Sequence, residues 1–165
     1  MTDNFIQLNK PNIIRLEIKD YEGKSTGEFL EFDIEETKAP LKYQEMIDKD
    51  RKNRKNLKNQ LKLIDKRQDV KGKKLMSKNE EDKIRAIDEF FQKEREVYDM
   101  FLGKDGVKKL LNGRKLGWTS LIEIGEIIEN QILPHLQKSA KTVEDRLKEI
   151  EKKYSEKESN VLTND

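Results

Sequence analysis

The spacing of apolar residues changes once along this chain, and that change limits the folds that it can adopt. Apolar residues alternate with charged ones over residues 14–18 and again over residues 30–34. An alternation of period two is typical of a strand with one buried face. Residues 21–27, between the two segments, supply two glycines and small polar residues, as a turn requires. We therefore predict an N-terminal β-hairpin.

From residue 40 onward the apolar residues recur at steps of three and four, the spacing of an amphipathic helix. Pro40 suits the first turn of a helix that reaches about residue 67. Ser77 and Glu80 match a capping box at the start of the next helix, and Gly103 is expected to end it. The chain is therefore predicted to be α+β and mostly α, with the hairpin followed by a helical domain.

A strongly apolar segment, residues 121–133, is predicted to lead into a long C-terminal helix. Ser120 and Glu123 suit a second capping box at its start. Pro134 removes one backbone hydrogen bond and crowds the preceding turn, so we expect a kink or a restart of the helix there. Beyond it, apolar residues step by four and three up to Tyr154, which resembles a heptad seam. Two interpretations stay open: the seam packs onto the domain, or it pairs with another chain.

These signals divide the chain into four parts: a hairpin region (1–39), a basic helix and linker (40–76), a helical domain (77–154) and a flexible C-terminal tail (155–165). Charged residues make up 41% of the chain and hydrophobic ones 33%, whereas typical globular domains carry about 25% charged residues. With few core residues per helix, we expect an elongated fold that buries further surface by forming a homo-oligomer.

The composition speaks against a catalytic site or a metal site. The chain has no cysteine and a single histidine, His135, which excludes disulfides and, in practice, a zinc site. The glycines of residues 102–106 lack the spacing of a phosphate loop. We therefore expect no enzyme, no cofactor and no metal. Residues 1–10 contain no apolar signal core, and no run approaches the roughly 18 apolar residues of a membrane span. A cytoplasmic protein with no membrane partner is expected.

Residues 49–74 form the most basic segment, with twelve basic residues and three acidic ones. Such a segment can bind a phosphate backbone. However, the formal net charge of the whole chain is only +2, and no aromatic residue for base stacking lies between Tyr43 and Phe90. Nucleic-acid binding is therefore the less favoured interpretation, behind a solvated helix or an electrostatic contact with protein.

The segment FLGKDGVKKLLNGR, residues 101–114, combines an aromatic residue, a Gly-acidic-Gly turn and a short helix ending in Gly-Arg. The apolar helix of residues 121–133 follows it, and the hairpin of residues 14–34 precedes it. In this order of parts the chain resembles the tail assembly chaperones of long-tailed bacteriophages that infect Gram-positive bacteria. The resemblance covers roughly two-thirds of the 165 residues.

The resemblance implies a protein that self-associates into rings or spirals in the cytoplasm of the bacterial host. It also implies that the partner is the tape measure protein, which the chaperone holds soluble during tail morphogenesis. Two alternatives remain: a coiled-coil structural or scaffold protein of the virion, and a nucleic-acid-binding protein that uses residues 49–74.

The candidate residues for partner binding or self-assembly are large apolar side chains of the helices. They are Phe91, Tyr98, Phe101, Ile124, Ile128, Leu136, Val143, Leu147, Ile150 and Tyr154. The spacing of these residues does not separate those that form the core from those that face a partner.

Overall fold

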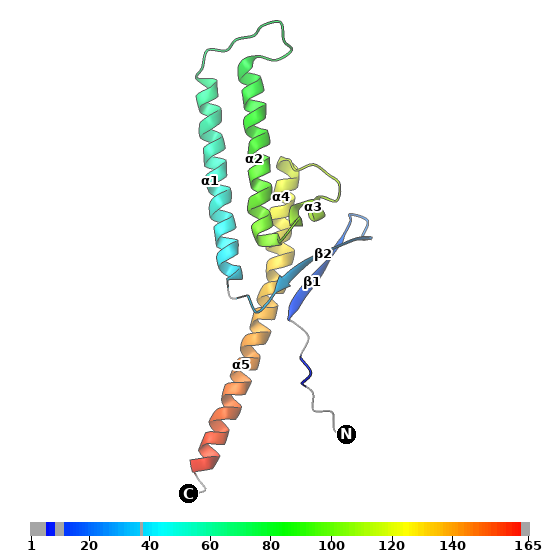
Figure 1. Ribbon diagram of the computed structural model, residues 1–165, viewed down its shortest axis with the longest axis vertical. Helices are drawn as coiled ribbons and strands as arrows, with labels where there is room; N and C mark the ends of the chain where they lie inside the picture. The colour runs from blue at the N-terminus through cyan, green and yellow to red at the C-terminus, as the bar shows by residue number, and fades with distance from the viewer. Residues whose placement is uncertain (1–5, 9–11, 37, 163–165) are drawn as a thin grey trace. The chain divides into compact units, whose positions relative to one another are not determined.

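The computed structural model describes residues 6–8, 12–36 and 38–162. Its elements are, in order, β1 (Ile13–Lys19), β2 (Ser25–Asp33), α1 (Ala39–Asp65), α2 (Lys78–Leu102), α3 (Gly106–Leu111), α4 (Trp118–Ile127), the π-helix η1 (Ile128–Ile132) and α5 (Leu133–Leu162) (Figure 1). A two-stranded antiparallel sheet followed by helices confirms the predicted α+β, mostly helical class.

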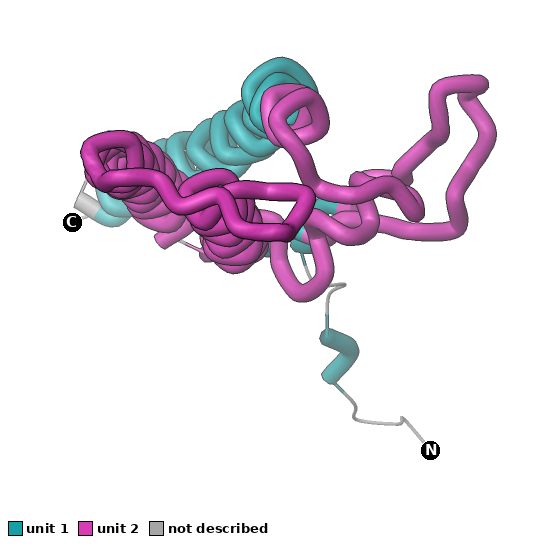
Figure 2. The backbone as a smooth tube through the Cα atoms, turned by 90° about the horizontal axis from the view of Figure 1, so that it is seen from above, with its two compact units in different colours: residues 1–14, 32–35, 125–165 teal, residues 15–31, 36–124 magenta. Residues whose placement is uncertain are grey.

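The chain forms two compact units, which Figure 2 distinguishes by colour. Unit 1 comprises residues 1–14, 32–35 and 125–165, and it contains η1 and α5. Unit 2 comprises residues 15–31 and 36–124, and it contains α1, α2, α3 and most of the hairpin.

The hairpin follows the predicted alternation. The apolar positions of residues 14–18 are the less exposed ones of β1. Asp20 closes the turn, because its side chain accepts hydrogen bonds from the backbone N–H groups of Glu22 and Lys24, each at 2.9 Å. Turn chemistry and strand period agree, which explains why the sequence predicted this element correctly.

One contact in unit 2 links β2 to α3. Lys109 Nζ donates a hydrogen bond to the backbone carbonyl of Phe29 at 3.1 Å, and the neighbouring Leu30 is buried. Since two strands alone are marginal in water, contacts outside the two strands are needed to stabilise the hairpin.

α1 and α2 lie side by side within unit 2 (Figure 1). The predicted capping box forms at the start of α2. Glu80 N–H donates to Ser77 Oγ at 3.2 Å, and Ser77 N–H donates to a Glu80 carboxylate oxygen at 2.8 Å. The buried apolar residues along the two helices include Met46, Leu57, Ile64, Ala86, Phe90 and Val97. Arg67, just after α1, pairs with Asp82 at 2.8 Å.

A sharp turn joins α2 to α3. Gly103 ends α2 as predicted, with φ of 92°, a backbone conformation that glycine adopts without a Cβ penalty. Asp99 Oδ1 accepts the backbone N–H of Val107 at 2.8 Å and so satisfies a free donor at the start of α3. Gly106 packs so closely that a Cβ at this position would collide with Cβ of Leu102.

We expect Gly106→Ala to lower the free energy of unfolding by about 1–3 kcal/mol, because the added methyl group overpacks this turn. Urea denaturation followed by circular dichroism measures the change. Gly72→Ala is the matched control, since a Cβ at Gly72 meets no atom. Equal stability of the two variants would show that the turn between α2 and α3 can open without cost.

The backbone stays helical from Trp118 to Leu162, but the regular α-helix is interrupted directly before Pro134, the place of the predicted kink or restart. The helix passes through a π turn, in which Leu133 N–H bonds to the carbonyl of Ile128. The wider turn displaces the preceding carbonyl groups, which a proline ring would crowd in a regular α-helix.

One local expectation was wrong. The capping box of Ser120 and Glu123 does not form, because α4 already begins at Trp118. Glu123 pairs instead with Arg114 at 2.8 Å. Residues 155–162, expected as a flexible tail, belong to α5. The serine hydroxyls in this segment donate to carbonyls one turn earlier, so they fit the helix. Residues 163–165 lie outside the described part of the chain.

Candidate protein-binding surfaces

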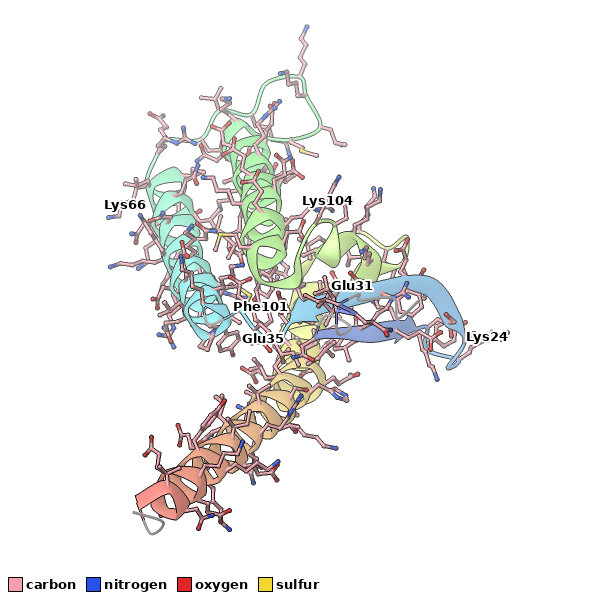
Figure 3. All side chains as sticks on the ribbon, turned by 60° about the horizontal axis from the view of Figure 1, so that its bottom comes forward. Lys24, Glu31, Glu35, Lys66, Phe101 and Lys104 are labelled. Carbon is pink, nitrogen blue, oxygen red and sulfur yellow. The ribbon has the colours of Figure 1, made fainter. Side chains whose placement is uncertain are left out.

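Four of the ten candidate residues are buried in the folded chain. Tyr98, Phe101, Ile124 and Ile128 are each exposed by 7% or less. Phe101 lies near the C-terminal end of α2 (Figure 3). Its ring meets that of Tyr43 of α1 edge to face, with centroids 5.5 Å apart. These side chains therefore act as core residues in this structure, and they offer no surface to a partner.

Phe91 belongs to an aromatic cluster in unit 2. Trp118, the first residue of α4, stacks on Phe90 with centroids 5.3 Å apart, and it meets Phe91 edge to face at 4.8 Å. Phe90 is buried, whereas Trp118 remains 46% exposed. Trp118 is not among the residues predicted from the sequence, although its position four residues before Ile122 places both on one face of the helix.

Isoleucines on the same helix faces as Phe91 and Trp118 add aliphatic surface near this cluster in sequence. Residues 84, 87 and 91 share one face of α2 at steps of three and four, and residues 118 and 122 share one face of α4. Ile84 is 54% exposed and Ile122 is 60% exposed. We name this surface of unit 2 the aromatic patch, and it consists of Ile84, Ile87, Phe91, Trp118 and Ile122.

The remaining candidates lie on α5 in unit 1. Leu136 and Val143 are half-buried, and Leu147, Ile150 and Tyr154 are exposed. The same step pattern continues to Val161, which is exposed and lies within the predicted tail of residues 155–165. We name this face the α5 stripe, and it consists of Leu136, Ala140, Val143, Leu147, Ile150, Tyr154 and Val161. An apolar stripe at heptad spacing that stays exposed is a surface suited to another helix.

A polar cluster lies between α1 and α2, formed by Asp50, Asn53 and Arg54 of α1 and by Glu94 and Tyr98 of α2. Asn53 Nδ2 donates to Glu94 Oε1 at 2.8 Å, and Arg54 Nε donates to both carboxylate oxygens of Asp50 at 3.0 Å. Glu94 is fully buried. Its burial, reinforced by a hydrogen bond with Asp50, raises its pKa to about 8. Burial and the Asp50 charge also raise the pKa of Tyr98 to about 12.

The protonated form of Glu94 explains an otherwise costly feature of this cluster. Among the described residues, Glu94 Oε2 is a buried side-chain oxygen without a hydrogen-bond partner in the ionised carboxylate form of Glu94. A protonated Glu94 carboxyl is a donor, and Asp50, whose carboxylate accepts from Arg54, is the acceptor of the hydrogen bond that helps to raise the pKa of Glu94. The cluster thus pairs the two helices internally, and its buried carboxyl is not open to a substrate.

The basic segment is partly neutralised by acidic residues of its own unit. Lys49 pairs with Glu45 at 3.0 Å, and Arg54 pairs with Asp50 at the same distance. His135 is exposed on α5. Among the described residues, no group of three or more His, Asp or Glu side chains is arranged to hold a metal ion. Within residues 6–8, 12–36 and 38–162, no helix has the length and apolar content that a membrane span needs.

No protein-family model, no curated protein and no solved structure matches this chain.

Proposed function

We propose that this chain is a phage tail assembly chaperone that self-associates and holds the tape measure protein soluble until the tail is built. The family and the partner come from the sequence resemblance. The observation that carries the holding role is the exposure of large apolar side chains at helical spacing, on the aromatic patch and on the α5 stripe. No catalytic step is part of the proposal.

The two surfaces fit two parts of this role. A long helical protein with apolar segments aggregates before assembly unless those segments are covered. The aromatic patch offers Phe91 and Trp118 with flanking isoleucines, a combination that binds the apolar face of a helix. The α5 stripe offers a heptad pattern, which suits self-association. The charged remainder of the surface keeps such a protein in solution while its apolar faces stay exposed.

Two competing functions lead to different outcomes in the same assay. A scaffold or structural protein of the virion would remain in the purified particle, whereas a chaperone would leave it. A nucleic-acid-binding protein would depend on residues 49–74 and would lose its partners after nuclease treatment.

We expect a tagged full-length chain, expressed in infected or induced host cells, to recover a very long helical tail protein after nuclease treatment. Mass spectrometry identifies the recovered protein. The double variant Ile84→Glu/Ile122→Glu should reduce this recovery by roughly tenfold or more, because two charges replace the exposed isoleucines that flank the aromatic residues of the patch.

The matched control is Leu63→Glu, which places the same charge at a 66% exposed leucine of α1 outside the patch. It should leave recovery unchanged, and circular dichroism of all variants checks that they fold. Equal recovery by the control and the double variant would remove the aromatic patch from the proposal. Recovery of nucleic acid alone, or retention of the chain in purified virions, would overturn the chaperone role itself.

A further inference from the structure

The two edges of the α5 stripe carry opposite charges. In heptad notation the stripe occupies positions a (140, 147, 154 and 161) and d (136, 143 and 150), with Lys157 at the last d position. One flank, position e, consists of Gln137, Glu144, Glu151 and Glu158. The other flank, position g, consists of Ser139, Arg146, Lys153 and Asn160. The e flank is therefore acidic, and the g flank is basic.

This division of charge distinguishes between the two ways in which α5 can pair with a copy of itself. In a parallel pair, each g position faces the following e position of the other helix, so Arg146 would meet Glu151 and Lys153 would meet Glu158. In an antiparallel pair, g faces g and e faces e, which would bring like charges together on both sides. Opposite charges at these flanks favour the parallel arrangement, and like charges disfavour the other one.

We propose that α5 pairs with α5 of a second copy of this chain as a parallel, in-register, two-stranded coiled coil. The inference rests on the self-association part of the proposed function and gives it an orientation and a partner. It does not depend on the aromatic patch or on the tail protein.

The exposed residues of α5 fit a second copy of the chain. Leu147, Ile150, Tyr154 and Val161 are each between 47% and 68% exposed, so about half or more of the surface of each residue remains to be covered. The stripe extends over roughly 38 Å at the rise of an α-helix. The acidic e flank of one copy is complementary in charge to the basic g flank of another copy, so no further partner is needed. Lys148 pairs with Glu144 of the same helix at 3.1 Å and lies outside the g flank. Arg146 and Lys153 are therefore the basic residues that select the orientation of the pair.

Cysteine cross-linking tests the orientation directly, because the chain has no cysteine of its own. Val161→Cys places a thiol at the last a position. Mild oxidation of the purified full-length variant should convert most of it to a covalent dimer, since the two thiols face each other in a parallel pair. Lys152→Cys, on the outer f position of the same helix, is the matched control and should form no covalent dimer under identical conditions, because its two thiols face away from each other.

An antiparallel pair would give the opposite pattern. It would place residue 161 beside residue 136, so Val161→Cys alone would not cross-link. A mixture of Val161→Cys and Leu136→Cys would cross-link instead. Either this pattern, or a monomeric mass by light scattering together with no cross-linking of Val161→Cys, would overturn the inference.

Charge variants test the selection of the partner. Glu144→Lys/Glu151→Lys/Glu158→Lys makes both flanks basic, and Arg146→Glu/Lys153→Glu makes both flanks acidic. We expect each variant alone to raise the dimer dissociation constant by roughly tenfold or more, and their mixture to restore pairing. Unchanged dimerisation of both variants would contradict the role of the flanks. These assays use purified protein and do not involve the tail protein. A negative result would therefore reject the coiled coil without rejecting the holding of the tail protein, which the recovery experiment tests.

Discussion

At pH 8 the variant Glu94→Gln is expected to unfold at higher urea concentration than the unmodified protein, and at pH 5 this advantage should disappear. The effect arises in the polar cluster between α1 and α2. There Glu94 is fully buried, accepts a hydrogen bond from Asn53 at 2.8 Å and has its pKa raised to about 8, chiefly by burial. A glutamine amide reproduces the protonated carboxyl, because it accepts from Asn53 and donates toward Asp50.

The sign of the pH dependence follows from the raised pKa. In the unfolded chain Glu94 ionises near its ordinary value of 4.5, whereas in the folded chain it keeps its proton up to about pH 8. Between these values the folded state binds more protons, so the free energy of unfolding falls as pH rises. The contribution of Glu94 to the free energy of unfolding is complete below about pH 4.5 and is lost as pH passes through about 8. At about 1.4 kcal/mol per pKa unit, the loss amounts to several kcal/mol.

Urea denaturation at pH values from 5 to 8.5 measures this slope. Glu94→Gln should remove much of it, since the amide cannot ionise. Glu96→Gln, at an exposed position of the same helix, is the matched control and should keep the slope of the unmodified protein. Parallel curves for the unmodified protein and Glu94→Gln would show that Glu94 is already ionised in the folded chain.

Phe101→Ala is expected to lower the free energy of unfolding by about 3–5 kcal/mol, a large fraction of the stability of a domain. The ring is 7% exposed and meets Tyr43 of α1, so truncation removes apolar burial and leaves a cavity beside α1. Urea denaturation at low protein concentration measures the loss, because self-association then contributes little to it.

Ile150→Ala supplies the comparison, since Ile150 was an equal candidate in the sequence but is 47% exposed in the structure. We expect it to change the stability of the dilute chain by less than about 1 kcal/mol. A cost similar to that of Phe101→Ala would mean that the α5 stripe is buried within a single chain. The pair of variants therefore separates core residues from surface residues among the original candidates.

Local signals account for the parts of the fold that the sequence predicted. The period-two alternation of residues 14–18 and 30–34 produced the hairpin, and Ser77 with Glu80 produced the capping box. Gly103 ended α2 as expected. Each of these features depends on residues close in sequence, whose hydrogen bonds and side-chain directions follow from their spacing.

Other features depend on what a distant segment contributes. Glu94 is four residues after Phe90 and four before Tyr98, so it lies on the apolar face of α2. This spacing is a sequence signal for a buried carboxyl. Its protonation, however, requires Asp50 and Asn53 of the neighbouring helix. In a similar way, Ser120 and Glu123 had the spacing of a cap, but Arg114 attracts the carboxylate instead.

By itself, the sequence determined the hairpin, the helical content and the heptad pattern of α5, because these follow from periodicity and local hydrogen bonding. Only the tertiary structure decided which apolar residues are core and which remain exposed. Phe101 and Leu147 have the same helical spacing and similar hydrophobicity, yet one packs against another helix and the other does not. Burial is a property of what packs against a residue, and packing between segments distant in sequence is not encoded in the spacing of either one.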